Sequence, residues 1–131
     1  MKFAIPVWGE SLSTVCDFSD TWLLIETMPQ GKRRSEFLDL CGFGLIERIE
    51  LLKKKEINIL LCGAISKTLE SWVRAAGIEV VPYLRGKTED VLNAYLDNRL
   101  FHQRYFLPGC RRHASYVRRR QRLRAGRDKM E

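Results

Sequence analysis

The order of its predicted elements makes this chain a single α/β domain built on a mixed five-stranded sheet. Short, extended apolar segments open the sequence and recur along it. Turn residues at 28–31 separate two of these segments and predict an antiparallel N-terminal hairpin. From Gly44 onward, helical periodicity alternates with short apolar runs. This alternation is typical of a βαβαβα second half with right-handed crossovers onto parallel strands.

Three strands are expected in the first half of the chain. Lys2–Val7 forms a strand that enters the core, and 9–13 is a polar loop that turns away from it. Thr21–Thr27 is a second strand, and Lys32–Leu40 returns beside it as its hairpin partner. The cationic start of this third strand suits an edge of the sheet or an exposed face.

An amphipathic helix should follow Gly44. Leu45, Ile46, Ile49 and Leu52 recur at helical spacing and form the apolar face. The charged residues between them are assigned to the opposite face: Glu47, Arg48, Glu50, Lys53, Lys54 and Lys55. The lysines gather at the C-terminal end of the helix, where the helix dipole favours cations.

Two further strand and helix pairs complete the predicted order. Ile57–Cys62 is mostly apolar, as expected for a strand that is buried on both faces, and Ile78–Pro82 is the next strand. Ser66 is the expected N-cap of the helix between them, and Gly77 stands where a left-handed C-terminal cap belongs. Thr88 is the expected N-cap of the last helix.

The positive charge of the protein is concentrated at one end of the chain. The 131 residues carry a formal charge of +7, but the segment from Gln103 to Glu131 holds ten of the 23 Lys and Arg residues and only two of the 16 acidic ones. The body is therefore close to neutral. We expect an α/β domain over 1–98 and a basic, Arg-rich tail over 99–131.

The sequence predicts a cytoplasmic protein with no membrane association. The longest apolar stretch, Ile57–Ile65, falls well short of the roughly 20 residues that cross a bilayer. Four widely spaced cysteines and no Cys-x-x-Cys pair indicate free thiols in a reducing compartment.

No motif indicates an enzyme. The sequence contains no nucleophile elbow, Walker loop or dinucleotide fingerprint, and its two histidines lie near or within the basic tail. Cys41-Gly42-Phe43-Gly44 places two glycines before a helix, which fits either an anion site or a plain connection. A ribonuclease-like enzyme is a distant alternative, because the acidic residues form no evident metal-binding cluster.

Cys62 is the strongest single candidate for a functional residue. It ends a buried parallel strand immediately before the loop that leads to Ser66, and open α/β sheets bind ligands at this edge. The positive end of the following helix would stabilise its thiolate, the form that binds iron. The alternative is that Cys62 is simply a small buried hydrophobe.

Cys16, Cys110 and His113 complete the candidate ligand set. Cys16 follows the first strand in a loop that could lie over the same sheet edge. Cys110 and His113 have Cys-x-x-His spacing, which could supply half of a metal site, although His113 could equally be a solvated tail residue. Soft thiolates from separate loops suit an iron-sulfur cluster that is held transiently.

Together these segments resemble the dinitrogenase iron-molybdenum cofactor biosynthesis proteins. The resemblance runs over about Met1 to Asn98 and rests on an ordered set of pieces: Lys2-Phe3-Ala4-Ile5-Pro6-Val7, Ser13 to Phe18, Leu23-Leu24-Ile25-Glu26, Ile59-Leu60-Leu61-Cys62-Gly63-Ala64-Ile65, Ala76-Gly77-Ile78-Glu79-Val80 and Gly86-Lys87-Thr88-Glu89-Asp90-Val91-Leu92. It implies a ribonuclease-H-like fold. It also implies a binding protein that carries iron-sulfur or iron-molybdenum-type clusters between donor and acceptor proteins during cofactor assembly for nitrogen fixation.

The sequence departs from this family in two places. The loop that often contains Ser-Pro-His-Phe or Ser-Pro-x-Phe is here Ser13-Thr14-Val15-Cys16-Asp17-Phe18, so Cys16 could replace a different donor. The tail is rich in arginine, whereas many relatives end in Gly-, His- or Cys-rich segments. A second hypothesis is therefore an adaptor that binds nucleic acid or an acidic partner through this tail, and a tail that only aids solubility is the third possibility.

Overall fold

The computed structural model describes residues 1–98 and 105–107 as one mixed α/β domain. Six strands form the sheet: β1 (Lys2–Trp8), β2 (Ser11–Leu12), β3 (Thr21–Thr27), β4 (Arg33–Asp39), β5 (Ile59–Leu61) and β6 (Glu79–Val81). Three helices accompany it: α1 (Leu45–Lys54), α2 (Lys67–Ala75) and α3 (Thr88–Leu96). The strand order is β4-β3-β1-β5-β6, with β2 paired to β1 outside this path.

The predicted mixed α/β architecture is confirmed. The sequence predicted five strands, and the described residues form six. β1 pairs antiparallel with β3, which pairs antiparallel with β4, while β1, β5 and β6 run parallel. The additional strand is β2, which lies within the segment 9–13 that was expected to be a polar loop. Leu12 pairs with Val7 of β1, and its side chain is buried. This burial explains why this part of the loop folds back as a strand.

Local sequence explains where several elements begin and end. Gln30 and Gly31 have positive φ angles of 68° and 75° at the β3–β4 turn. Ser66 caps α2 as predicted, because its hydroxyl accepts a hydrogen bond from the Leu69 amide at 3.2 Å. The expected N-cap of α3 is wrong by one residue: Lys87 occupies the cap, and Thr88 is the first helical residue and is buried.

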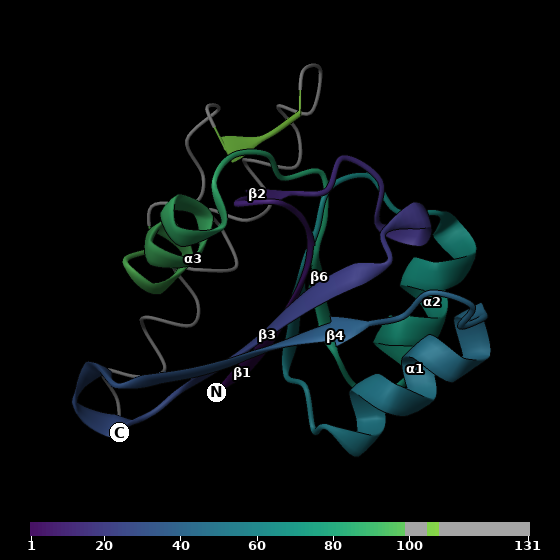
Figure 1. Cartoon of the computed structure of the whole chain (residues 1–131), viewed down its shortest axis with the longest axis horizontal. Helices are drawn as coiled ribbons and strands as arrows, with labels where there is room; N and C mark the ends of the chain where they lie inside the picture. The colour runs from purple at the N-terminus through teal and green to yellow at the C-terminus, as the bar shows by residue number, and fades with distance from the viewer. Residues whose placement is uncertain (99–104, 108–131) are drawn as a thin grey trace.

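The sheet separates two hydrophobic cores. Figure 1 shows α1 and α2 together on one side of the sheet and α3 on the other. The core under α3 contains Phe3, Ile5, Val91 and Leu92. The core under α1 and α2 contains Leu52 and Leu69 and also both buried cysteines, Cys16 and Cys62. Any chemistry of these two thiols therefore belongs to the α1–α2 side.

None of the three described helices combines the length and the apolar character that crossing a membrane would need.

Candidate functional site

The candidate site lies where β5 ends and the segment 13–18 crosses it. Three backbone hydrogen bonds hold this segment, which we call the cover loop, against the sheet. The Ser13 amide donates to the Pro6 carbonyl at 2.9 Å, the Ala64 amide to the Thr14 carbonyl at 2.8 Å, and the Cys16 amide to the Ala64 carbonyl at 2.7 Å. The loop is thus fastened to β1 and to the segment that follows Cys62.

Gly63 makes this close approach possible. A Cβ atom at Gly63 would lie 2.5 Å from the Ser13 carbonyl oxygen and 2.6 Å from that of Thr14. Real Cβ atoms do not come so close to backbone oxygens, so a side chain here would push the cover loop off the sheet. The main role of Gly63 is therefore to admit the cover loop.

Two of the predicted ligands meet beneath the cover loop. Cys16 begins a single turn of 3-10 helix (Cys16–Phe18), and its side chain lies in the same core cluster as that of Cys62, close enough to raise the pKa of the Cys62 thiol. Both side chains are fully buried, with 0% exposure. The structure thus brings together two sulfur atoms from residues that are far apart in the chain, and it encloses them in the core under α1 and α2.

The surroundings of Cys62 favour its neutral thiol. Its pKa is raised well above the ordinary value of 9.0, first by the hydrogen bond with Cys16, then by burial and by the negative charges of Glu70 and Asp17. From the sequence, the N-terminus of α2 was expected to favour the thiolate. Burial and the paired thiol outweigh that dipole, so in this closed arrangement Cys62 is neither charged nor accessible.

Asp17 joins the cover loop to α2 by two hydrogen bonds. Its Oδ1 accepts from the Ser66 amide at 2.9 Å, and its Oδ2 accepts from the Ser66 hydroxyl at 2.6 Å. Negative charge is favourable at a helix N-terminus, where amide groups lack partners within the helix. Sequence patterns could not identify this role, because 49 positions separate the two residues.

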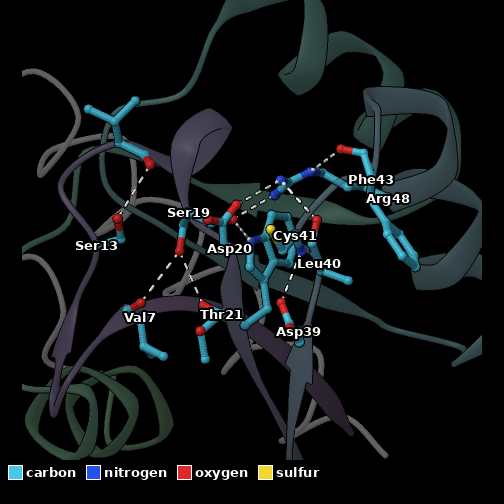
Figure 2. A network of polar contacts seen from close by, with 12 residues as sticks. Val7, Ser13, Ser19, Asp20, Thr21, Asp39, Leu40, Cys41, Phe43 and Arg48 are labelled. Atoms are coloured by element: carbon cyan, nitrogen blue, oxygen red, sulfur yellow. Dashed lines mark hydrogen bonds and ion pairs between the residues drawn. The ribbon is translucent and has the colours of Figure 1, made fainter.

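Arg48 forms a second polar network beside the loop (Figure 2). Its guanidinium donates to the carbonyl oxygens of Ser19 at 2.6 Å, Phe43 at 3.3 Å and Leu40 at 3.5 Å. It also lies 3.7 Å from an Asp20 carboxylate oxygen and 5.9 Å from the centre of the Trp22 ring. Arg48 is only 5% exposed. The prediction that it lies on a charged outer face of α1 is therefore wrong.

This network fixes the segment at the N-terminus of α1. The Cys41-Gly42-Phe43-Gly44 sequence was a candidate for an anion site. The Arg48 guanidinium lies beside it, but its N–H groups already donate to the backbone carbonyls of Phe43 and Leu40. Cys41 itself is exposed and donates its amide to Asp39 at 3.0 Å. The arrangement supports the interpretation of 41–44 as a structural connection between β4 and α1.

The remaining predicted ligands, Cys110 and His113, lie outside the described residues, as does most of the basic tail. Within 1–98 and 105–107, no group of three or more His, Cys, Asp or Glu side chains is placed to hold a metal ion. Among the described residues, the candidate metal donors that lie together are therefore the thiols of Cys16 and Cys62.

A groove of about 300 Å³ lies away from the thiols, at the start of β1 and the end of α1. Its lining mixes apolar and charged side chains, among them Lys2, Leu24, Arg34, Glu36 and Lys55. Lys55 and Glu36 already form an ion pair at 3.0 Å. Neither Cys16 nor Cys62 lines this groove, so it offers no route to them.

No protein-family model and no curated protein matches the sequence. Solved structures do share the fold. The structure described as PH0822 superposes with a TM-score of 0.68 at 20% identity, covering 76% of this chain and 93% of that one. A candidate dinitrogenase from Methanocaldococcus jannaschii has a TM-score of 0.62 at 15% identity, covering 76% of this chain and 90% of its own.

Two further structures extend this likeness. The apo form of the orange protein from Desulfovibrio gigas has a TM-score of 0.62 at 17% identity, covering 75% of this chain and 88% of its own. A Thermotoga protein described as a candidate NifB protein has a TM-score of 0.60 at 18% identity, covering 75% and 89% of the respective chains. At these identities the likeness establishes a shared fold.

Proposed function

We propose that this protein binds and carries a metal–sulfur cluster of the iron-sulfur or iron-molybdenum type during cofactor assembly. The observation that carries the proposal is the juxtaposition of the Cys16 and Cys62 thiols at the carboxyl end of β5. Ligand sites of open α/β sheets occur at this edge, and thiolates are the donors that iron-sulfur clusters need. The descriptions of two fold neighbours, a candidate dinitrogenase and a candidate NifB protein, support the same theme.

In this proposal the described arrangement is the closed, unloaded form. Both thiols are buried, and Cys62 holds its proton, so loading requires the cover loop to lift and the thiols to lose protons. The contacts to be broken are the three backbone hydrogen bonds of the loop and the two that Asp17 accepts from Ser66. Lifting the loop would expose both donors at once.

The proposed function is binding rather than catalysis. Cluster donor and acceptor proteins are the partners that it requires. Cys110 and His113 remain proposed as additional ligands, supplied from outside the described residues. The alternative hypothesis of nucleic-acid or acidic-partner binding through the Arg-rich tail stays a prediction, because that segment also lies outside them.

Anaerobic reconstitution of the full chain with ferrous iron and sulfide tests the proposal. We expect charge-transfer absorption and bound iron in the wild type, and the loss of both in a Cys16→Ser, Cys62→Ser double variant. Cys41→Ser is the matched control, because Cys41 is an exposed thiol away from the pair, and this variant should load like the wild type. A metal-free wild-type product, or unchanged loading of the double variant, would overturn the assignment. A Cys110→Ser variant measures the contribution of the third predicted thiol.

A further inference from the structure

Within residues 1–98 and 105–107, the β4 strand forms an open edge of the sheet. In the strand order β4 is terminal and pairs only with β3 among the described residues. Six of its seven residues are exposed, and Leu38 is half-buried. Phe37 is 67% exposed, which is unusual for a large aromatic side chain in a regular strand. At the opposite edge, by contrast, Leu84 forms a bridge with Phe106 just after β6.

The hydrogen bonds of the hairpin show which backbone groups of β4 face outward. The Met28 amide donates to the Lys32 carbonyl at 2.7 Å, and the Leu40 amide donates to the Asp20 carbonyl at 2.6 Å. Because backbone groups alternate sides along a strand, the even-numbered residues of β4 bond to β3. The amides and carbonyls of Arg33, Ser35, Phe37 and Asp39 therefore point away from the sheet. They are a template for one more strand.

The charges along β4 determine which strand fits. The strand begins with two cations, Arg33 and Arg34, and its later part carries two anions, Glu36 and Asp39. An identical strand in antiparallel orientation would place each cationic half opposite an anionic half, whereas a parallel copy would place like charges together. Opposite charges across a strand pair are favourable, and like charges are unfavourable. The edge is therefore complementary to itself in one orientation.

One antiparallel register places oppositely charged side chains of the two β4 strands directly opposite each other. With Ser35 opposite the same residue of a second copy, Arg34 stands opposite Glu36 of the partner subunit, and this pair occurs twice by symmetry. The Glu36 carboxylate is half-exposed and already pairs with Lys55 of its own chain at 3.0 Å, so Arg34 would share it. Arg33, whose guanidinium already donates to Asn93 at 2.6 Å and to Glu89 at 3.3 Å within its own chain, then stands opposite Phe37 of the partner subunit. Such a two-fold arrangement is the commonest form of homodimer.

We propose that β4 pairs antiparallel with β4 of a second copy of this chain, so that the two sheets join into one. The pairing uses outward backbone groups that make no bond to β3 and a charge pattern that favours a self-partner over a strand of uniform charge. It does not involve Cys16 or Cys62, so it stands independently of the cluster proposal.

Sedimentation velocity of the full chain over a wide concentration range tests the dimer. We expect a concentration-dependent dimer in the wild type. Ser35→Pro removes an outward-facing amide without removing a bond to β3, so this variant should be monomeric and should unfold at the thermal midpoint of the dilute, monomeric wild type. Ser35→Ala keeps the amide and should still dimerise. A wild type that is monomeric throughout, or a Ser35→Pro variant that still dimerises, would overturn the proposal.

Charge reversal provides a second, independent arm. Arg34→Glu replaces two attractive contacts by two repulsive ones and should weaken dimerisation by about tenfold. The double variant Arg34→Glu, Glu36→Arg restores opposite charges across the two-fold axis and should regain most of the affinity. Hydrogen exchange at the Ser35 and Phe37 amides should slow as the dimer forms. Equal protection in the dilute monomer would mean that this chain covers its own edge, which contradicts the proposal.

Discussion

Asp17 accepts two hydrogen bonds from Ser66, one from its backbone amide at 2.9 Å and one from its hydroxyl at 2.6 Å. Ser66 in turn accepts from the Leu69 amide and caps α2. One carboxylate thus connects the cover loop to the first turn of a helix. The contact lies at the surface, while the next residue toward the N-terminus, Cys16, is in the core. Asp17 is therefore well placed to control how often the thiols become accessible.

Asp17→Ala should increase the rate at which Cys16 and Cys62 react with an alkylating reagent. Losing a capping carboxylate typically costs about 1 kcal/mol, which corresponds to roughly fivefold more frequent opening of the loop. The measurement is the labelling rate at each thiol by mass spectrometry, in a Cys41→Ala background. Asp90→Ala, which removes an exposed acidic residue from the first turn of α3, should leave both rates unchanged. Equal labelling of Asp17→Ala and the wild type would show that the loop opens without releasing this contact.

Gly63→Ala should displace the cover loop and destabilise the protein. The added methyl group would meet two backbone carbonyl oxygens, and that of Thr14 is held by the Ala64 amide, so the loop must shift, at a cost of about 1–3 kcal/mol. Urea denaturation measures this loss. Gly44→Ala is the matched control, because the nearest atom to its Cβ is a Glu47 side-chain oxygen at 3.8 Å. If both variants were equally stable, the packing of the loop against Gly63 would be looser than described.

Arg48→Met should destabilise the fold by about 2–4 kcal/mol. Methionine fills similar space but leaves the carbonyls of Leu40 and Phe43 without their guanidinium donor in a buried region. Arg48→Lys keeps the charge and should recover only part of the loss, because one ammonium group cannot reproduce the planar fork of donors. Denaturant titration of the three proteins tests this order. If Arg48→Met were as stable as the wild type, the hydrogen bonds of Arg48 would make no net contribution to the free energy of unfolding.

The stability of the protein should fall above pH 9 partly because of Cys62. Its pKa is raised on folding, so the folded protein retains this proton when the unfolded chain, with a thiol pKa near 9.0, has released it. The contribution is complete below pH 9.0 and is lost as the pH rises towards the folded pKa, with a slope of about 1.4 kcal/mol per pH unit.

The measurement for Cys62 is the free energy of unfolding as a function of pH, in the wild type and in Cys62→Ala. Lysines and tyrosines titrate in both proteins, so the informative quantity is the difference between the two slopes. We expect the wild type to lose stability more steeply above pH 9.0. Parallel curves would contradict the raised pKa.

The order of the elements could be predicted because each one has its own local pattern. The short apolar run of β5 and the alternating faces of α1 and α2 are visible without any knowledge of the tertiary fold. β2 was missed because two residues are too few to show a period, and its pairing with β1 depends on the turn at 9–10. Lys87 rather than Thr88 occupies the N-cap position of α3, without a side-chain capping bond, and Thr88 is the buried first residue of the helix. A one-residue shift of this kind is not visible in the sequence pattern.

The candidate site was predictable only in part. The end of a parallel strand indicated Cys62, and the position of Cys16 in a loop after the first strand suggested that it could lie over the same sheet edge. The raised pKa of Cys62 was not foreseen, because the helix dipole was considered without the burial that opposes it. Arg48 was assigned to solvent by its charge and helical position. Its burial depends on Ser19 and Leu40, which reach it from distant segments of the chain.

Because the sheet separates two cores, the cysteines and the buried indole of Trp22 share one compartment, and Phe3 and Tyr95 stack edge to face in the other. Events at the sulfur atoms should consequently alter the fluorescence of the buried Trp22, which can be followed separately from the exposed Trp8 and Trp72 in a Trp8→Phe, Trp72→Phe background.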